Sequence, residues 1–279
     1  MVLVQGECPG GLSTSLDFSG IKMTLYNSIG KTYNNTRIAD ERIVSELIRL
    51  IGLENGSIIA DIGAGTGNYS IALVNAGFNI IAIEPSAIML SHSKQNSNIK
   101  CISGSAENIP LKRNSVDAVI SVLALPHFSN IRNAFNEMAR IVKKGPIIIF
   151  TFDPQIGRKT WMYDYFPFFW DSFSSLPTAK DTMKILKNCT GLSAQIIPFK
   201  LPSDLKDNFA AAAWKKPQLY LDQDYRSNIS SFRMSDTAVV DASLKRLSID
   251  LKNGRWEKLY GNILRMNTID AGYYFLFAK

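Results

Sequence analysis

Hydrophobic residues between positions 39 and 153 alternate between helical and strand-like spacing. Ile43, Leu47 and Ile51 recur at the spacing of one helix face, and Gly52 marks the end of that helix. Short apolar runs predict strands at 57–62, 78–83, 99–103, 116–123 and 146–152, and further helices are expected at 67–76, 86–95 and 130–142. Continuous apolar strands separated by helices are typical of a parallel sheet that is covered on both faces. With right-handed crossovers, the pattern predicts a doubly wound α/β sheet of the nucleotide-binding type.

The second half of the chain has a different pattern of hydrophobic residues. Residues 161–170 are dense in aromatic side chains and are interrupted by Pro167. A helix is expected at 178–188, a sixth strand at 194–199, mostly helix at 202–266, and a last strand at 272–278. Because the last strand needs a sheet to pair with, we expect insertions near 154–177 and 202–266 that form a cap on one mostly parallel, seven-stranded sheet. A separate C-terminal domain is the alternative. The chain therefore divides into an N-terminal segment (1–38), an α/β core (39–153) and a remainder that completes the sheet (154–279).

Composition narrows the class of protein. Hydrophobic residues make up 46% of the 279 positions and charged residues 20%, which is enough apolar side chain for a packed core. No apolar run approaches the ~20 residues of a membrane span, and the first lysine is Lys22, so we expect a cytoplasmic protein without a secretory signal. Three distant cysteines and two histidines give neither a disulfide framework nor a metal centre, and we expect no metal.

The chain is basic, with 31 Lys and Arg against 24 Asp and Glu. Basic proteins often bind nucleic acid. Here the cations are scattered as short pairs, such as Lys112 with Arg113 and Lys143 with Lys144. A solvated surface is the favoured interpretation, and RNA binding stays as an alternative.

A glycine-rich turn follows the first predicted strand. Residues 58–67 read IIADIGAGTG, with glycines at 63, 65 and 67. Glycines between a strand and a helix let a ligand approach the backbone at the carboxyl edge of the sheet. The spacing is GxGxG, whereas a dinucleotide fingerprint is GxGxxG, so an NAD-dependent oxidoreductase is disfavoured. Asp61, just before the glycines, would be poorly placed against a pyrophosphate but suits a ligand that carries an ammonium or sulfonium group.

Two further strand ends carry polar groups. Glu84 closes the second strand, where a carboxylate can accept hydrogen bonds from the two hydroxyls of a ribose. Ser105 and Ala106 follow the third strand, where backbone N–H groups and a short side chain could contact the edge of an adenine ring. A polar strand end and an ordinary loop are the simpler interpretations.

Five segments in fixed order now resemble a known family. ADIGAGTGNYS, AIEPSAIML, SGSAENIPL, SVDAVISVLALPHF and NEMARIVKKGPIIIF are similar to the class I S-adenosylmethionine-dependent methyltransferases, within them the type-11 group of the ubiquinone/menaquinone C-methyltransferases. The resemblance covers residues 37–153. It implies the Rossmann-like methyltransferase fold, S-adenosyl-L-methionine as cofactor and S-adenosyl-L-homocysteine as product.

The resemblance also implies roles for single residues. Carried over motif by motif, Asp61, Gly63, Gly65 and Thr66 would line the methionine portion of the cofactor, Glu84 would bind the ribose, Ser105 and Ala106 would flank the adenine, and the backbone at Val122 would contact the methionine amino end. Two positions depart from the pattern. Many relatives have Asp where this chain has Ser105, which leaves a weaker, uncharged acceptor. Many also have two histidines where this chain has Pro126 and His127.

The candidates for catalysis and acceptor binding are less specific. Methyl transfer from a sulfonium depends mainly on positioning, and a general base helps only when the acceptor atom begins protonated. His127 is the best-placed titratable group, although it could simply pack the corner after the fourth strand. In this group the N-terminal segment often folds over the cofactor, which would bring Tyr33 near the methyl group, where an aromatic face attracts the cationic sulfur; a surface tyrosine is the alternative.

Candidate acceptor contacts come from two parts of the chain. Tyr26 and Arg37 lie in the same N-terminal segment. Trp161 and Tyr165 belong to the aromatic run of the first insertion, which as a pocket wall would favour a flat or apolar acceptor. Cap core or a dimer contact would explain this run equally well.

Together these features predict a methyltransferase for a small-molecule acceptor that acts as a monomer or homodimer. An RNA methyltransferase would require a continuous basic face beside the cofactor site. A non-catalytic S-adenosylmethionine-binding protein would lack an acceptor pocket.

Overall fold

The computed structural model describes residues 37–93 and 98–279, and its centre is one seven-stranded sheet. The strand order is β3 (Ile99–Ser103), β2 (Asn79–Glu84), β1 (Ile58–Ile62), β4 (Ala118–Val122), β5 (Ile147–Phe152), β9 (Tyr273–Ala278) and β6 (Ala194–Pro198). Strand β9 runs antiparallel to both of its neighbours, and the other paired strands are parallel. The doubly wound seven-stranded sheet expected from the sequence is therefore confirmed, and its order reverses between β1 and β4.

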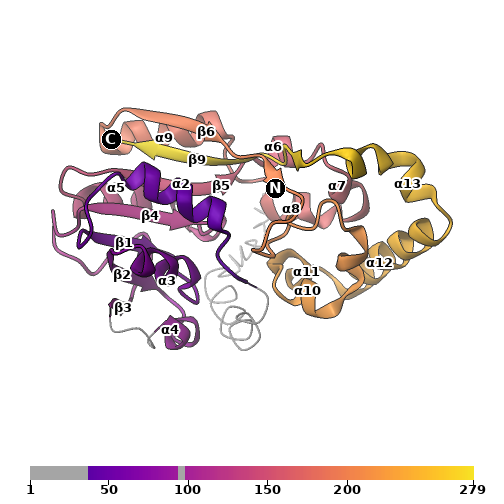
Figure 1. The fold of residues 1–279 in the computed structure, drawn as a ribbon, viewed down its shortest axis with the longest axis horizontal. Helices are drawn as coiled ribbons and strands as arrows, with labels where there is room; N and C mark the ends of the chain where they lie inside the picture. The colour runs from indigo at the N-terminus through magenta and orange to yellow at the C-terminus, as the bar shows by residue number, and fades with distance from the viewer. Residues whose placement is uncertain (1–36, 94–97) are drawn as a thin grey trace, which may run out of the picture.

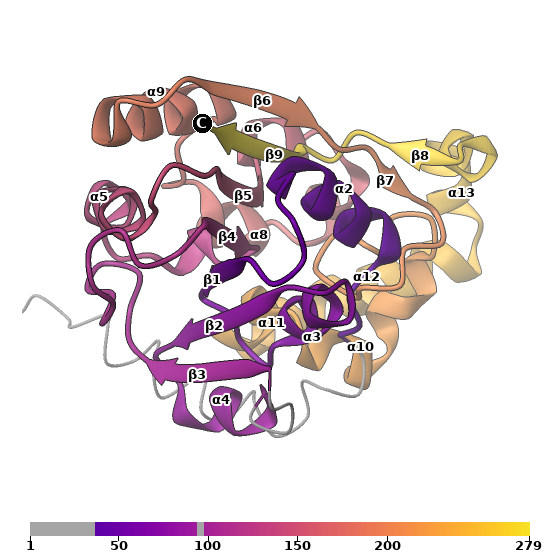
Figure 2. The ribbon, with the colours of Figure 1, turned by 60° about the vertical axis from the view of Figure 1, so that its left-hand side comes forward.

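Helices cover both faces of the sheet. Helices α2 (Glu41–Ile51) and α3 (Asn68–Asn75) pack on one face, and α5 (Ile131–Ile141) and α9 (Ala179–Thr190) pack on the other (Figure 2). Helix α4 (Ala87–Ser93) contacts β3 at the sheet edge. Successive strand residues supply the two cores, since Ile59 and Ile148 face α2 while Ala60 and Ile149 face α5. The uninterrupted apolar strands in the sequence thus reflect burial on both faces.

Local sequence signals set the helix ends. The Asp40 carboxylate caps α2 by accepting from the Arg42 N–H, and Gly52 ends that helix in the left-handed region at φ 55°. Asn130 caps α5 in the same way. Helix α9 begins at the cap residue Thr178 and ends at Gly191.

A helical cap extends from the carboxyl ends of the strands. After β5 the chain forms α6 (Pro154–Gly157), α7 (Trp161–Tyr165) and α8 (Phe168–Phe173), and between β6 and β9 it forms the 3-10 helix η3 (Pro217–Leu221), α10 (Gln223–Ser227), α11 (Ser230–Met234), α12 (Thr237–Lys252), α13 (Arg255–Tyr260) and the 3-10 helix η4 (Gly261–Arg265). Figure 1 shows this cap as a lobe beside the sheet. A two-stranded ribbon of β7 (Leu201–Pro202) and β8 (Thr268–Ile269) joins both ends of the larger insertion. None of the described helices has the length and apolar character that a membrane crossing requires.

Aromatic side chains fill the interior of the cap. Trp161 packs edge-on against Tyr220 and Trp256, with ring centroids 5.5 and 5.4 Å away, and its indole N–H donates to the Trp214 carbonyl over 2.7 Å. The Tyr165 hydroxyl donates to Asp250 Oδ2 over 2.8 Å. The aromatic run predicted from the sequence is therefore largely the core of the cap.

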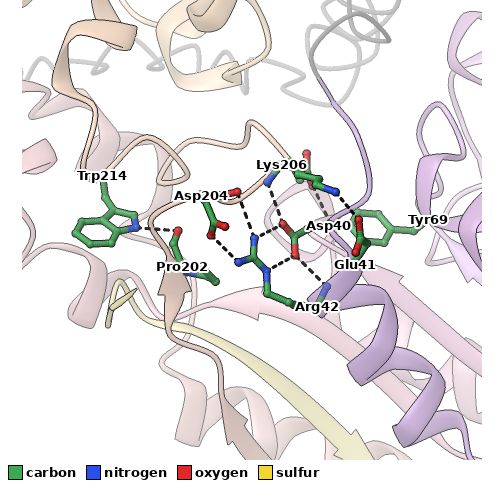
Figure 3. A network of polar contacts seen from close by, with 9 residues as sticks. Asp40, Glu41, Arg42, Tyr69, Pro202, Asp204, Lys206 and Trp214 are labelled. Carbon is green, nitrogen blue, oxygen red and sulfur yellow. Dashed lines mark hydrogen bonds and ion pairs between the residues drawn. The ribbon is translucent and has the colours of Figure 1, made fainter. Parts of the chain in front are cut away.

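A polar network ties the cap to the first helix of the core (Figure 3). The buried Asp40 carboxylate accepts from Arg42 and also from the backbone N–H of Lys206, over 2.9 Å. Arg42 Nη1 donates to Asp204 Oδ1 over 2.6 Å, and the Lys206 ammonium pairs with Glu41. Burial by itself would raise the pKa of Asp40, but the hydrogen bonds from Arg42 and Lys206 outweigh it, and the pKa is lowered. The residue that caps α2 thus also fixes the cap against the sheet.

Candidate functional site

A cavity of about 1010 Å³ opens at the carboxyl ends of the central strands. Pockets for small molecules usually enclose ~300–1,000 Å³, so this one can hold a cofactor together with a second molecule. Its wall includes the loops after β1, β2, β3 and β4, together with residues from the cap. Doubly wound sheets bind ligands at this edge, where the strand order reverses.

The glycine loop after β1 forms one wall of the cavity. Gly63 and Gly65 adopt φ values of 73° and 58°, in the left-handed region that favours glycine. A Cβ on Gly63 would lie only 2.4 Å from the Cβ of Ala124, in the turn after β4. Because Gly63 has no Cβ, the loop after β4 packs directly against the glycine loop. The backbones of both loops line the cavity.

Glu84 braces this loop from the end of β2. Its Oε2 accepts from the Gly65 N–H and its Oε1 from the Ser86 N–H, both over 3.0 Å. Burial raises the pKa of Glu84, and the two backbone hydrogen bonds only partly offset that effect. Each carboxylate oxygen has a second lone pair, and Glu84 lines the cavity, so it can also accept hydrogen bonds from a ligand.

Asp61 lies behind the glycine loop and is not among the residues that line the cavity. It is 2% exposed, and its Oδ2 accepts from the Ser70 hydroxyl over 2.6 Å. Burial raises its pKa to about 6; the Ser70 hydrogen bond opposes this shift and the nearby charge of Glu84 adds to it. Asp61 can therefore act on a bound ligand through its charge, and not through the direct contact that its motif position suggested.

Most of the other predicted site residues meet at the cavity. Its lining includes Arg37, Gly63, Gly65, Thr66, Glu84, Ser105, Ala106, Val122 and His127. Trp161 and Tyr165 are not part of it, because they are buried in the cap core, and this corrects the expectation that they form an acceptor wall. Tyr26 and Tyr33 lie outside the described residues.

Two features of the cavity were missed from the sequence. Leu123 adopts φ 57°, a left-handed conformation that costs a non-glycine residue roughly 1–2 kcal/mol. Its N–H donates to the Phe150 carbonyl over 2.8 Å, and the turn brings the next residue, Ala124, against Gly63. Glu107 Oε1 accepts from the N–H and hydroxyl of Ser129, over 2.6 and 3.0 Å, which joins the loop after β3 to the start of α5. No local sequence signal marks either feature.

Aromatic rings line another part of the cavity, and we call this set the aromatic wall. It consists of Phe152, Phe173, Phe209 and Tyr273. Strand pairing places Phe152 opposite Tyr273 although 121 positions separate them. The wall therefore depends on long-range pairing, which the sequence pattern alone does not reveal.

A buried carboxylate connects the N-terminal side, the core and the cap at the cavity. Asp207 from the cap is 1% exposed and pairs with Arg37 through both of its oxygens. The Tyr69 hydroxyl, from the first turn of α3, donates to Asp207 Oδ2 over 2.9 Å. Burial and the charge of Asp207 raise the pKa of Tyr69 well above its ordinary value, so the phenol stays protonated. All three residues line the cavity.

Comparison with known proteins identifies the family. Residues 60–150 match a methyltransferase domain. A crystal structure from Anabaena variabilis, described as a methyltransferase of an antibiotic biosynthesis pathway, is 43% identical and has a TM-score of 0.85. That alignment covers 88% of this chain and 99% of the Anabaena protein.

More distant proteins agree at the level of the domain or the fold. A malonyl-[acyl-carrier protein] O-methyltransferase from Pectobacterium atrosepticum is 33% identical over 37% of this chain, and the chain spans only 42% of its length. A Haemonchus contortus phosphoethanolamine N-methyltransferase in complex with S-adenosylmethionine has the same fold at 14% identity, with a TM-score of 0.54 over 96% of this chain and 58% of its own. The sheet order, the glycine loop and the 43% identical relative together show that the chain belongs to the class I S-adenosylmethionine-dependent methyltransferases, in the type-11 group.

Proposed function

We propose that this enzyme methylates a small-molecule acceptor by in-line displacement. The observation that carries the proposal is a single cavity whose lining includes the glycine loop, Glu84 and the aromatic wall. When bound, S-adenosylmethionine supplies a methyl group on a positively charged sulfur. An acceptor held against the aromatic wall would approach that methyl from within the same cavity.

The residues present fit the cofactor. The left-handed conformations of Gly63 and Gly65, and the absence of a Cβ at Gly65, where only Met89 Sδ at 3.7 Å would be in contact, let a ligand lie close to the loop backbone. Glu84 would accept from the ribose hydroxyls, Ser105 and Ala106 would flank the adenine, and Thr66 and the Val122 backbone would lie near the methionine end. The buried charges of Glu84 and Asp61 favour a cationic ligand over a pyrophosphate.

Enclosure supports catalysis by positioning. Burying an acceptor between the cap and the sheet restricts its orientation, and such restriction can contribute roughly 7–11 kcal/mol to lowering the barrier. Arg37 and Tyr69 hold Asp207 at this boundary, so that the cap side of the cavity has a defined shape. We include Arg37 among the acceptor-side residues for this reason.

His127 is the general base that we propose for an acceptor atom that begins protonated. It belongs to the 3-10 helix η2 (Leu125–His127), just beyond the turn that touches the glycine loop, and it lines the cavity. A neutral histidine imidazole can accept a proton near neutral pH. Tyr33 and Tyr26 stay predictions from the sequence.

The alternatives receive less support. A non-catalytic binding protein would not need the aromatic side of the cavity. An RNA methyltransferase would need a continuous basic surface, whereas the arginines in the described lining are Arg37, which is paired with Asp207, and Arg132.

Replacing Glu84 tests the cofactor site. Glu84→Ala should weaken S-adenosylhomocysteine binding by roughly 1.5–3 kcal/mol, the range for hydrogen bonds to charged groups. Calorimetry measures the change, and Glu54→Ala, at an exposed loop position, is the matched control. Equal affinities for the Glu84 variant and the wild type would remove the ribose assignment.

The raised pKa of Asp61 predicts a pH dependence. In the ligand-free enzyme, Asp61 titrates near 6 when folded and near 3.8 when unfolded, so the stability it contributes when protonated is lost as pH rises through 6. A cationic cofactor favours the ionised form, so its binding near pH 6 should release protons, and its affinity should fall as pH drops below 6. Calorimetry in buffers of different ionisation enthalpy measures this release. Asp61→Asn should remove most of it, and an unchanged pH dependence in that variant would contradict the argument.

Replacing His127 tests the proposed base. His127→Ala should slow methyl transfer to a phenolic acceptor by about 10²–10⁴-fold, the usual contribution of a positioned base. The rate is followed as S-adenosylhomocysteine formation, while cofactor affinity should stay at the wild-type value. Wild-type turnover in the variant would make His127 a packing residue.

A further inference from the structure

The aromatic wall offers a continuous apolar surface of tilted and edge-on rings to an acceptor. The ring centroids of Phe152 and Phe173 are 5.1 Å apart, those of Phe152 and Tyr273 are 5.4 Å apart, and those of Phe209 and Tyr273 are 4.8 Å apart. Aromatic surfaces of this kind gain most by burying flat, apolar ligands. The wall thus favours a ring system over a flexible polar chain.

The charges around the cavity disfavour an anionic acceptor. Two arginines occur in the described lining, Arg37 and Arg132. Arg37 is paired with Asp207 through both carboxylate oxygens, so the pair presents no net positive charge to a ligand in the cavity. Arg132 is exposed in the first turn of α5. Glu107 Oε1 accepts hydrogen bonds from the backbone N–H groups of Ser129 and Asn130, which precede this turn. Burying a carboxylate or phosphate without a compensating cation is costly.

One residue of the lining, Asn228, carries a buried acceptor atom that has no partner in the described residues. The Asn228 side-chain NH₂ donates to the Asp224 carbonyl over 2.9 Å, which identifies the opposite end of the amide as Oδ1. That oxygen is buried and has no hydrogen-bond partner in the described part of the chain. Asn228 is 6% exposed and lines the cavity together with Ile229 and Ser230.

A second unpartnered group lies in the same turn. The buried hydroxyl of Ser231, three residues after Asn228, likewise has no hydrogen-bond partner in the described residues. Leaving a buried acceptor unpaired is destabilising. Of the two residues, Asn228 lines the cavity and Ser231 does not, so a ligand that donates a hydrogen bond would remove this cost at Asn228.

We propose that the methyl acceptor is an uncharged, flat and largely apolar molecule that carries a hydroxyl or N–H group, and that Asn228 recognises this donor. The proposal rests on the proposed small-molecule methyltransferase function and names its acceptor class. The aromatic wall binds the ring, the buried Arg37 is already paired with Asp207 and so does not favour an anion, and Asn228 selects for the donor. Asn228 is thereby a specificity-determining residue for the acceptor.

Three probes with one ring system test this proposal. 2-Naphthol carries a donor, naphthalene carries none, and 2-naphthoate replaces the donor by a negative charge. Calorimetry with enzyme saturated with S-adenosylhomocysteine should give at least about tenfold tighter binding for 2-naphthol than for either other probe, the value of one hydrogen bond near 1.4 kcal/mol. Asn228→Leu, of similar size, should remove this preference for 2-naphthol over naphthalene. Asn262→Leu, at an exposed position of the cap, is the control and should preserve it.

Each outcome bears on one claim. If the wild type does not bind S-adenosylhomocysteine, the proposed function itself fails. If it binds S-adenosylhomocysteine but 2-naphthoate binds more tightly than 2-naphthol, or if 2-naphthol does not bind, the acceptor class is wrong. If Asn228→Leu keeps both its affinity for S-adenosylhomocysteine and the full preference for 2-naphthol, Asn228 does not read the donor. If the Asn228→Leu variant does not fold, the comparison of the three probes in the wild type still tests the acceptor class.

Discussion

The buried carboxylate of Asp207 is the interaction on which the enclosed cavity depends. It joins Arg37 at the entry to the core, Tyr69 next to the glycine loop, and the cap in which it lies. A buried charge of this kind is tolerated only with partners that satisfy it. The three segments must therefore come together in one arrangement, and that arrangement closes the cavity on the cap side. The neighbouring network around Asp40 secures the same boundary from the surface.

The opposite side of the cavity depends on two loops in contact. Gly63 and Ala124 approach so closely that a side chain at position 63 has no room, and Glu84 holds the loop from β2. The strained backbone at Leu123 is part of this contact. Strain of this kind persists only where the surrounding structure enforces it, and it concentrates at functional sites. The shape of the cavity thus depends on two neighbouring constraints at one edge of the sheet.

Features with a local cause were predictable from the sequence. The ends of α2 and α9 follow from Asp40, Gly52 and Gly191, which act on their own helices. The parallel strands and the position of the glycine loop follow from patterns within a few residues. Features that depend on contacts between residues far apart in the sequence could not be predicted in this way. The β7–β8 ribbon pairs two residues with two others more than sixty positions away, and the aromatic wall depends on the pairing of β5 with β9. The aromatic run at 161–170 attracted attention through its composition, yet Trp161 and Tyr165 stabilise the cap instead of lining the cavity.

A crystal structure of the enzyme with bound S-adenosylhomocysteine would show how the cofactor site and the rest of the cavity are connected. We expect the ligand to lie along the glycine loop with its sulfur open to the space bordered by the aromatic wall. A ligand bound elsewhere, or one whose sulfur is sealed off from that space by protein, would contradict it.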